Sequence, residues 1–100
     1  MKNTYVARAI CSVRAENPEY DRGMRGAYLG VLCRALSISD AASLISNEFE
    51  ALDLNLVGFE LIVDHRYLDR SLSEYEKDLL EELDIFPIQY RNVHYFSPDS

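Results

Sequence analysis

The residues of this chain whose chemistry could be put to use are two histidines, two cysteines and a run of carboxylates. His65 lies beside Asp64 and close to Asp69, so a metal site or a His–Asp acid–base pair is one interpretation. His94 stands alone near the C-terminal end, and no Cys/His spacing typical of a metal site recurs. We therefore expect no catalytic residue, no metal and no cofactor, and we expect both imidazoles at the rim of a sheet.

Cys11 and Cys33 each fall within a run of alternating small apolar residues. If the chain folds antiparallel about residue 22, the two thiols face each other across a hairpin and a disulfide is conceivable. A cysteine buried in mid-strand has no access to a substrate, and nothing there lowers its pKa. We therefore expect both cysteines to be reduced, buried and unreactive.

A short glycine motif, Gly23-Met24-Arg25-Gly26, has the GxxG form with which KH domains grip a nucleic-acid backbone. In that fold the loop joins two helices, whereas here it falls between two predicted strands. The net charge of −7 also disfavours nucleic acid and anionic lipid, because Lys and Arg supply the affinity for both. We predict that the chain binds neither nucleic acid nor membrane, and that the glycines permit a turn.

Carboxylates crowd into one stretch near the C-terminus, with Lys77 as the only cation among them. A solvated helix face is the usual meaning of such a run. The more specific interpretation is a binding surface for a basic partner, because carboxylates along a helix can imitate the charge of a phosphate backbone. Catalysis is the least favoured use, since an exposed helix cannot separate two carboxyl pKa values. The carboxylates are Glu74, Glu76, Asp78, Glu81, Glu82 and Asp84.

The charges are also sorted along the chain. Residues 1–35 carry six basic and three acidic groups, whereas residues 36–100 carry four basic and fourteen acidic groups. A net charge of −7 keeps a small protein soluble, and it also attracts a basic macromolecule over a long range. With 48% hydrophobic residues and no apolar run of about 20 residues, we expect one cytoplasmic domain over residues 1–100.

Two alternating segments, 4–15 and 27–36, are predicted to pair as a hairpin around the polar connection 16–26. A helix is expected over 39–53, behind serine N-cap candidates, and a further strand over 55–65. In that strand, four residues are expected to be buried: Val57, Phe59, Leu61 and Val63.

A second helix is expected to begin near Ser71 or Ser73, since each has Glu three residues on, the spacing of a capping box. Pro87 ends that pattern, and residues 88–96 are predicted to form a last strand at an edge of the sheet. The predicted class is α+β, a two-layer sandwich of about four largely antiparallel strands in the order ββαβαβ, with both helices on one face.

The face of the sheet that carries no helix is the other candidate for binding. We expect it to expose apolar and aromatic area, and Tyr and Arg are the residue types enriched at interface hot spots. The alternative is ordinary cross-strand pairing of its arginines with Glu60 and Asp64. A homodimer formed through this face is a sub-case of the first interpretation. Its expected residues are Arg8, Ile10, Arg14, Tyr28, Leu32, Arg34, Ile62, Tyr90 and Phe96, with Tyr28, Arg34 and Tyr90 as binding residues.

In size, acidic charge and lack of motifs, the chain resembles the small acidic bacterial immunity proteins that neutralise a cognate toxin, often a nuclease. That group shares no common motif, so the resemblance assigns no residue. It implies a non-enzymatic protein-binding module that occludes a more basic partner. The alternative is a dimeric ligand-sensing or regulatory domain with a ferredoxin-like layout, although the predicted strand order departs from that layout. A small enzyme built on His65 or His94 is the third hypothesis.

Overall fold

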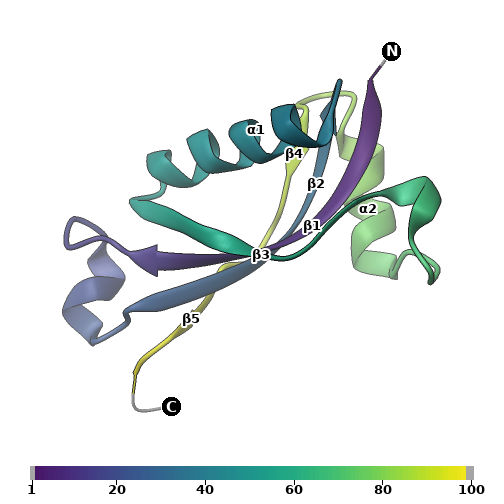
Figure 1. Cartoon of the computed structure of the whole chain (residues 1–100). Helices are drawn as coiled ribbons and strands as arrows, with labels where there is room; N and C mark the ends of the chain where they lie inside the picture. Colours follow the sequence, from purple (N-terminus) through teal and green to yellow (C-terminus); the bar gives the residue numbers. More distant parts are fainter. Residues whose placement is uncertain (1, 99–100) are drawn as a thin grey trace.

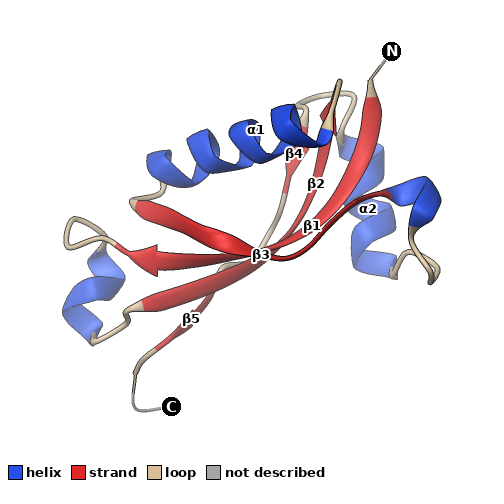
Figure 2. Cartoon of the chain, in the orientation of Figure 1, coloured by secondary structure: helices blue, strands red, loops and turns tan. Residues whose placement is uncertain are grey.

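A five-stranded antiparallel sheet forms the centre of the computed structural model, which describes residues 2–98 (Figure 1, Figure 2). The strand order is β3-β1-β2, and both β4 and β5 pair with the outer edge of β2. The predicted α+β class, with a largely antiparallel sheet and two helices, is confirmed. The strands are β1 (Asn3–Val13), β2 (Gly26–Ala35), β3 (Leu54–Asp64), β4 (Ile88–Gln89) and β5 (His94–Phe96).

The β1–β2 hairpin has the predicted strands but a different register. Its connection contains a 3-10 helix, η1 (Pro18–Arg22), which ends at Gly23 with φ of 88°. This compact turn brings Gly26 opposite Ser12, so Cys11 pairs with Ala27. The prediction that Cys11 faces Cys33 is therefore wrong, because the helical turn shifts the centre of the hairpin toward the N-terminus.

Helix α1 (Ile38–Ala51) begins behind Ser37, whose side chain accepts a hydrogen bond from the Asp40 N–H. Its buried stripe is Ala41, Ile45 and Phe49. The strand residues beneath it are mostly small, which lets the helix axis come close to the sheet. This main core also takes in Leu29, Leu54 and both cysteines.

Helix α2 (Glu74–Glu82) lies on the opposite face of the sheet (Figure 1). Its Leu79 and Leu83 form a second, smaller cluster with Val6 and Leu32. Those two strand residues pair with each other, and they alternate with the residues that α1 covers. The expectation that both helices cover one face is therefore corrected. Alternate residues at this end of the hairpin are apolar on both faces, so each face needs a cover.

Strand β3 is an edge strand, and it departs twice from regular pairing with β1. Arg8 pairs with Leu61 and Ala9 with Phe59, which leaves Glu60 as an extra residue. A second shift, between Gly58 and Leu56, leaves Val57 extra. Such bulges turn side chains outward. The predicted burial of Val57 and Leu61 is accordingly wrong, since they are 68% and 36% exposed.

The predicted last strand, 88–96, is divided into β4 and β5. β4 pairs with Leu32 and Cys33, and β5 pairs with residues 26–28. Between them, the segment 90–93 leaves the sheet, and no backbone hydrogen bond joins it to Gly30. The outer edge of β2 is therefore unpaired at its middle.

Candidate functional site

The acidic run 74–84 is largely neutralised within the fold. Four of its six carboxylates form ion pairs: Glu74 with Lys77, Glu76 with Arg70, Glu82 with Arg91, and Asp84 with Arg34. Asp78 and Glu81 are exposed and take part in no ion pair among residues 2–98. The run therefore presents much less free negative charge than its sequence suggests.

The pair between Arg70 and Glu76 has the strongest geometry in this region. Two guanidinium nitrogens of Arg70 donate to the two carboxylate oxygens of Glu76, at 2.7 and 3.0 Å. The same carboxylate accepts the Ser73 N–H at 2.8 Å, which completes a capping box. The hydrogen bonds from Arg70 hold the pKa of Glu76 below its usual value. Glu76 thus fixes the start of α2.

Two of the residues expected to bind a partner serve within the fold. Arg34 pairs with Asp84, and its N–H donates to the Pro87 carbonyl at 2.8 Å, so it holds the turn before β4. Tyr90 packs edge-on against Phe49 at 6.2 Å, in the core beneath α1. Its expected place on the reverse face is corrected, because the chain leaves the sheet after β4. Ile62 also lies in that core, and Leu32 is covered by α2.

The free negative charge gathers instead on and after α1. Residues 35–65 contain no Lys or Arg, so the carboxylates there have no cation nearby in the sequence. Only Glu60 and Asp64, at the far part of β3, reach an arginine. Four carboxylates take part in no ion pair within the described part of the chain: Asp40, Glu48, Glu50 and Asp53. The sequence alone indicates Glu48, Glu50 and Asp53 as added charge at the end of the first helix, but none of them was a predicted binding residue, although the cation-free stretch was a signal for this cluster.

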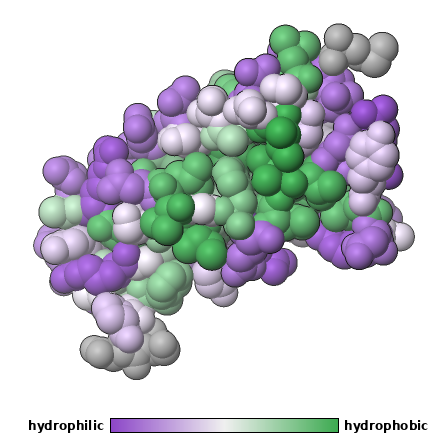
Figure 3. Space-filling model, in the orientation of Figure 1, coloured by the Kyte–Doolittle hydropathy of each residue, from purple (hydrophilic) through white to green (hydrophobic). Residues whose placement is uncertain are grey.

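The edge strand β3 adds apolar surface beside this acidic flank. Val57 is exposed, and Leu56 and Phe59 are only partly buried against the main core. Leu61 is also exposed, but it pairs with Arg8 and therefore lies on the face opposite α1. Figure 3 shows hydrophobic surface over β3, on the side that faces the viewer in Figure 1. We call this region the α1–β3 surface and define it by Glu50, Asp53, Leu56 and Val57.

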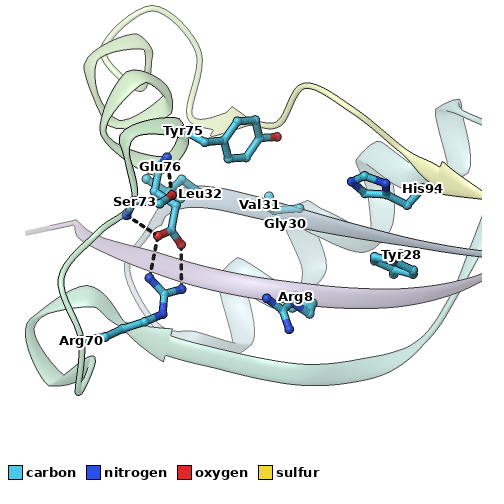
Figure 4. Close-up of a pocket in the computed structure, with 10 residues that line it drawn as sticks. All are labelled: Arg8, Tyr28, Gly30, Val31, Leu32, Arg70, Ser73, Tyr75, Glu76 and His94. Carbon is cyan, nitrogen blue, oxygen red and sulfur yellow. Dashed lines mark hydrogen bonds and ion pairs between the residues drawn. The ribbon is translucent and has the colours of Figure 1, made fainter.

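The reverse face carries a pocket of about 570 Å³ (Figure 4). Gly30 lies on its floor, Arg8 borders it from β1, and Tyr75 and the Arg70–Glu76 pair border it from α2 and the preceding loop. The remaining wall is formed by Tyr28 and His94, whose rings stack with centroids 5.1 Å apart. Of the predicted binding residues, Tyr28 and Glu76 are the two that line this pocket.

Among residues 2–98, His65 and His94 form no ion pair with a carboxylate. Asp64, next to His65, is held by the Arg66 side chain at 2.7 Å, and these hydrogen bonds lower the pKa of Asp64 to about 2. The carboxyl group is thus committed to Arg66. His94 stacks on Tyr28. Across residues 2–98, the structure shows no group of three or more His, Cys, Asp or Glu side chains arranged to hold a metal ion.

Both cysteines are buried and free. Burial raises the pKa of the Cys11 thiol to about 11, and it does the same for Cys33. A thiolate is the nucleophilic form, so neither side chain is activated for covalent chemistry.

The GxxG segment is folded back on its own loop. Gly23 ends η1 in the left-handed conformation. The guanidinium of Arg25 lies 3.6 Å from the centre of the Tyr20 ring and donates to the Tyr20 carbonyl. At Gly26, a Cβ atom would lie 2.1 Å from the Phe96 ring, so this glycine makes room for β5. Each glycine has a structural use, and the arginine between them is engaged.

Comparison with protein families, with curated proteins and with solved structures gives no match for this chain. Within residues 2–98, no helix has the length and apolar character needed to cross a bilayer.

Proposed function

We propose that this protein is a non-enzymatic protein-binding module that captures a more basic protein. The observation that carries the proposal is the α1–β3 surface, where an exposed apolar strand edge lies beside Glu50 and Asp53, two carboxylates that take part in no ion pair among residues 2–98. An apolar centre with a charged border is the composition of many protein-binding surfaces. We therefore place the binding surface here rather than on α2, whose carboxylates are mostly paired.

The acidic border defines the chemistry of the partner. After the internal ion pairs are formed, the net charge of −7 remains, and much of the unpaired charge belongs to α1 and Asp53. A basic partner is drawn to such a surface over a distance of about 10 Å at moderate salt. The association rate should therefore fall as ionic strength rises.

Immunity-type inhibition is the form of this activity that fits the chain best. A toxin nuclease has a basic surface that binds the phosphate backbone of its nucleic-acid substrate. An acidic surface of this kind would occlude that basic surface. This form of the proposal rests on likeness to small acidic immunity proteins in size and charge.

A second copy of this chain is a less suitable occupant of the α1–β3 surface. The two extra residues of β3, Val57 and Glu60, interrupt the regular edge that another strand would need for pairing. Two copies would also bring like charges together. A heterologous basic partner avoids both difficulties.

The proposal is tested by using the immobilised protein to capture a partner from a lysate of the native host at low salt. Variants with single substitutions at exposed positions, which should fold as wild type does, are compared with it. Val57→Asp places a charge in the apolar centre, and Ile85→Asp is its control, since Ile85 is 84% exposed elsewhere. Glu50→Lys reverses a charge on α1, and Glu81→Lys reverses an exposed, unpaired carboxylate on α2. We expect wild type and both controls to retain one basic polypeptide in stoichiometric amount, released by about 0.5 M salt. We expect Val57→Asp and Glu50→Lys to lose it.

Three outcomes would overturn the proposal. The protein elutes alone or as a stable dimer, the captured polypeptide is acidic, or all four variants capture it equally well. Loss of capture with Glu81→Lys but not with Glu50→Lys would show that the partner binds α2 and not the α1–β3 surface.

A further inference from the structure

We infer that the pocket beside Gly30 binds a small aromatic carboxylate. This inference does not rest on the proposed function, because the pocket lies on the face of the sheet opposite α1. Its volume of about 570 Å³ falls within the range of small-molecule sites.

The one carboxylate in the pocket is already used. The Glu76 carboxylate accepts two bonds from Arg70 and one from the Ser73 N–H. Its side chain is only 12% exposed. A ligand that must donate hydrogen bonds, such as an amine, therefore finds its one acidic partner occupied.

Hydrogen-bond donors, by contrast, remain. The Tyr75 hydroxyl accepts the Arg91 N–H at 2.9 Å, which leaves its own proton to donate. The Ser73 hydroxyl accepts the Glu76 N–H at 3.1 Å, and its proton is left in the same way. A pocket with spare donors and an engaged carboxylate is suited to an oxygen-rich ligand.

The charge balance adds a preference for an anion. Arg70 and Glu76 cancel each other in a bidentate pair. Arg8 has only a long contact of 3.5 Å with Glu60, and both side chains are more than half exposed, so this pair is weak. The Arg8 guanidinium thus leaves the pocket with a positive balance, and its planar donors match a carboxylate.

The floor and walls suit a flat apolar body. At Gly30, an added Cβ would meet no atom within 4 Å, so the space above the backbone is open. Glycine weakens a strand interior, and it often marks a place where a ligand approaches the backbone. The rings of Tyr75 on one side, and of Tyr28 and His94 on the other, border this space (Figure 4). An aromatic ring between them would contact ring surfaces on both sides.

The test uses three probes of similar shape and different charge: benzoate, benzamide and benzamidine. Binding is followed by chemical-shift changes in the folded protein up to about 20 mM probe, which reaches affinities in the millimolar range. We expect benzoate to bind best and to shift signals of Gly30, Tyr28 and His94. We expect Arg8→Gln to weaken benzoate about tenfold and to remove its advantage over benzamide.

Gly30→Val fills the floor with a residue that strands tolerate well, and it should weaken benzoate at least about tenfold. Gly58→Val is the matched control, because Gly58 lies on the same face in β3, has equal open space and does not line the pocket. The inference is overturned if none of the probes binds, if benzamidine binds as well as benzoate, or if Gly30→Val leaves benzoate binding unchanged.

Discussion

Tyr28 and His94 stack across the β2–β5 pair, with ring centroids 5.1 Å apart and ring planes inclined by 18°. The Phe96 ring lies 6.2 Å from that of Tyr28 and above Gly26. β5 has only three residues, and these ring contacts add to its backbone pairing with residues 26–28 in holding it to the sheet. They also fix one wall of the pocket.

Tyr28→Ala should destabilise the fold by about 1 kcal/mol, because it removes an aromatic pair along with the apolar area of the ring. Urea unfolding measures this difference in free energy. Tyr67→Ala is the control, since Tyr67 is 74% exposed. This substitution should change the free energy of unfolding by less than about 0.5 kcal/mol. Equal effects of the two substitutions would contradict a role for the stack.

Ser73→Ala should cost about 1 kcal/mol, because it removes the hydroxyl that caps α2. Ser71→Ala, two residues earlier, removes a hydroxyl that caps no helix and should be close to neutral. Ser73→Asp should retain most of the stability, since a carboxylate also accepts the N–H of the first turn. The three variants are compared by urea unfolding, and a loss for Ser71→Ala as large as that for Ser73→Ala would refute the assignment of the cap.

The Asp64–Arg66 interaction should make stability depend on acidity. The pKa of Asp64 in the folded state is about 2, below its usual value of 3.8. The contribution of the Asp64 carboxylate to the free energy of unfolding is therefore complete at pH values above its usual pKa of 3.8, and it is lost as the pH falls from about 4 toward 2. Unfolding free energies of wild type and Asp64→Asn should differ at pH 6 and converge near pH 2. A constant difference across this interval would show that the carboxyl charge does not contribute.

The thiols of Cys11 and Cys33 should be unreactive toward thiol reagents in the folded protein. Both are buried, their pKa values are about 11, and they stand at different register positions of the hairpin. A thiol reagent at neutral pH should modify neither until denaturant is added, and then both. Mild oxidation of the native protein should form no intramolecular disulfide, and rapid labelling without denaturant would contradict the burial of these side chains.

Much of the fold can be predicted from residue patterns, because the relevant interactions are local. Alternation located β1, β2 and β3 to within two residues. Serine followed by glutamate limited the start of α2 to Ser71 or Ser73, and the structure has Ser73 as the N-cap. The hairpin register could not be predicted in the same way. It depends on η1, a turn whose length is set by its own caps.

The candidate surfaces were harder to predict because they depend on contacts between distant residues. Arg34 and Asp84 are fifty positions apart in the chain, and only the fold shows that they neutralise each other. The acidic run therefore looked free in the sequence. The pocket likewise depends on the bend at 90–93, which the alternating pattern of 88–96 does not reveal.

The unequal size of the two clusters has a consequence for motion. The cluster beneath α2 has four buried residues, Val6, Leu32, Leu79 and Leu83, whereas the main core has fifteen. Regions with little buried apolar surface open first, so α2 should detach in brief excursions while the hairpin and α1 stay intact. Amide hydrogen exchange would then be faster in α2, which forms one wall of the pocket, than in the hairpin. A small molecule could enter the pocket when α2 detaches, without any unfolding of the sheet.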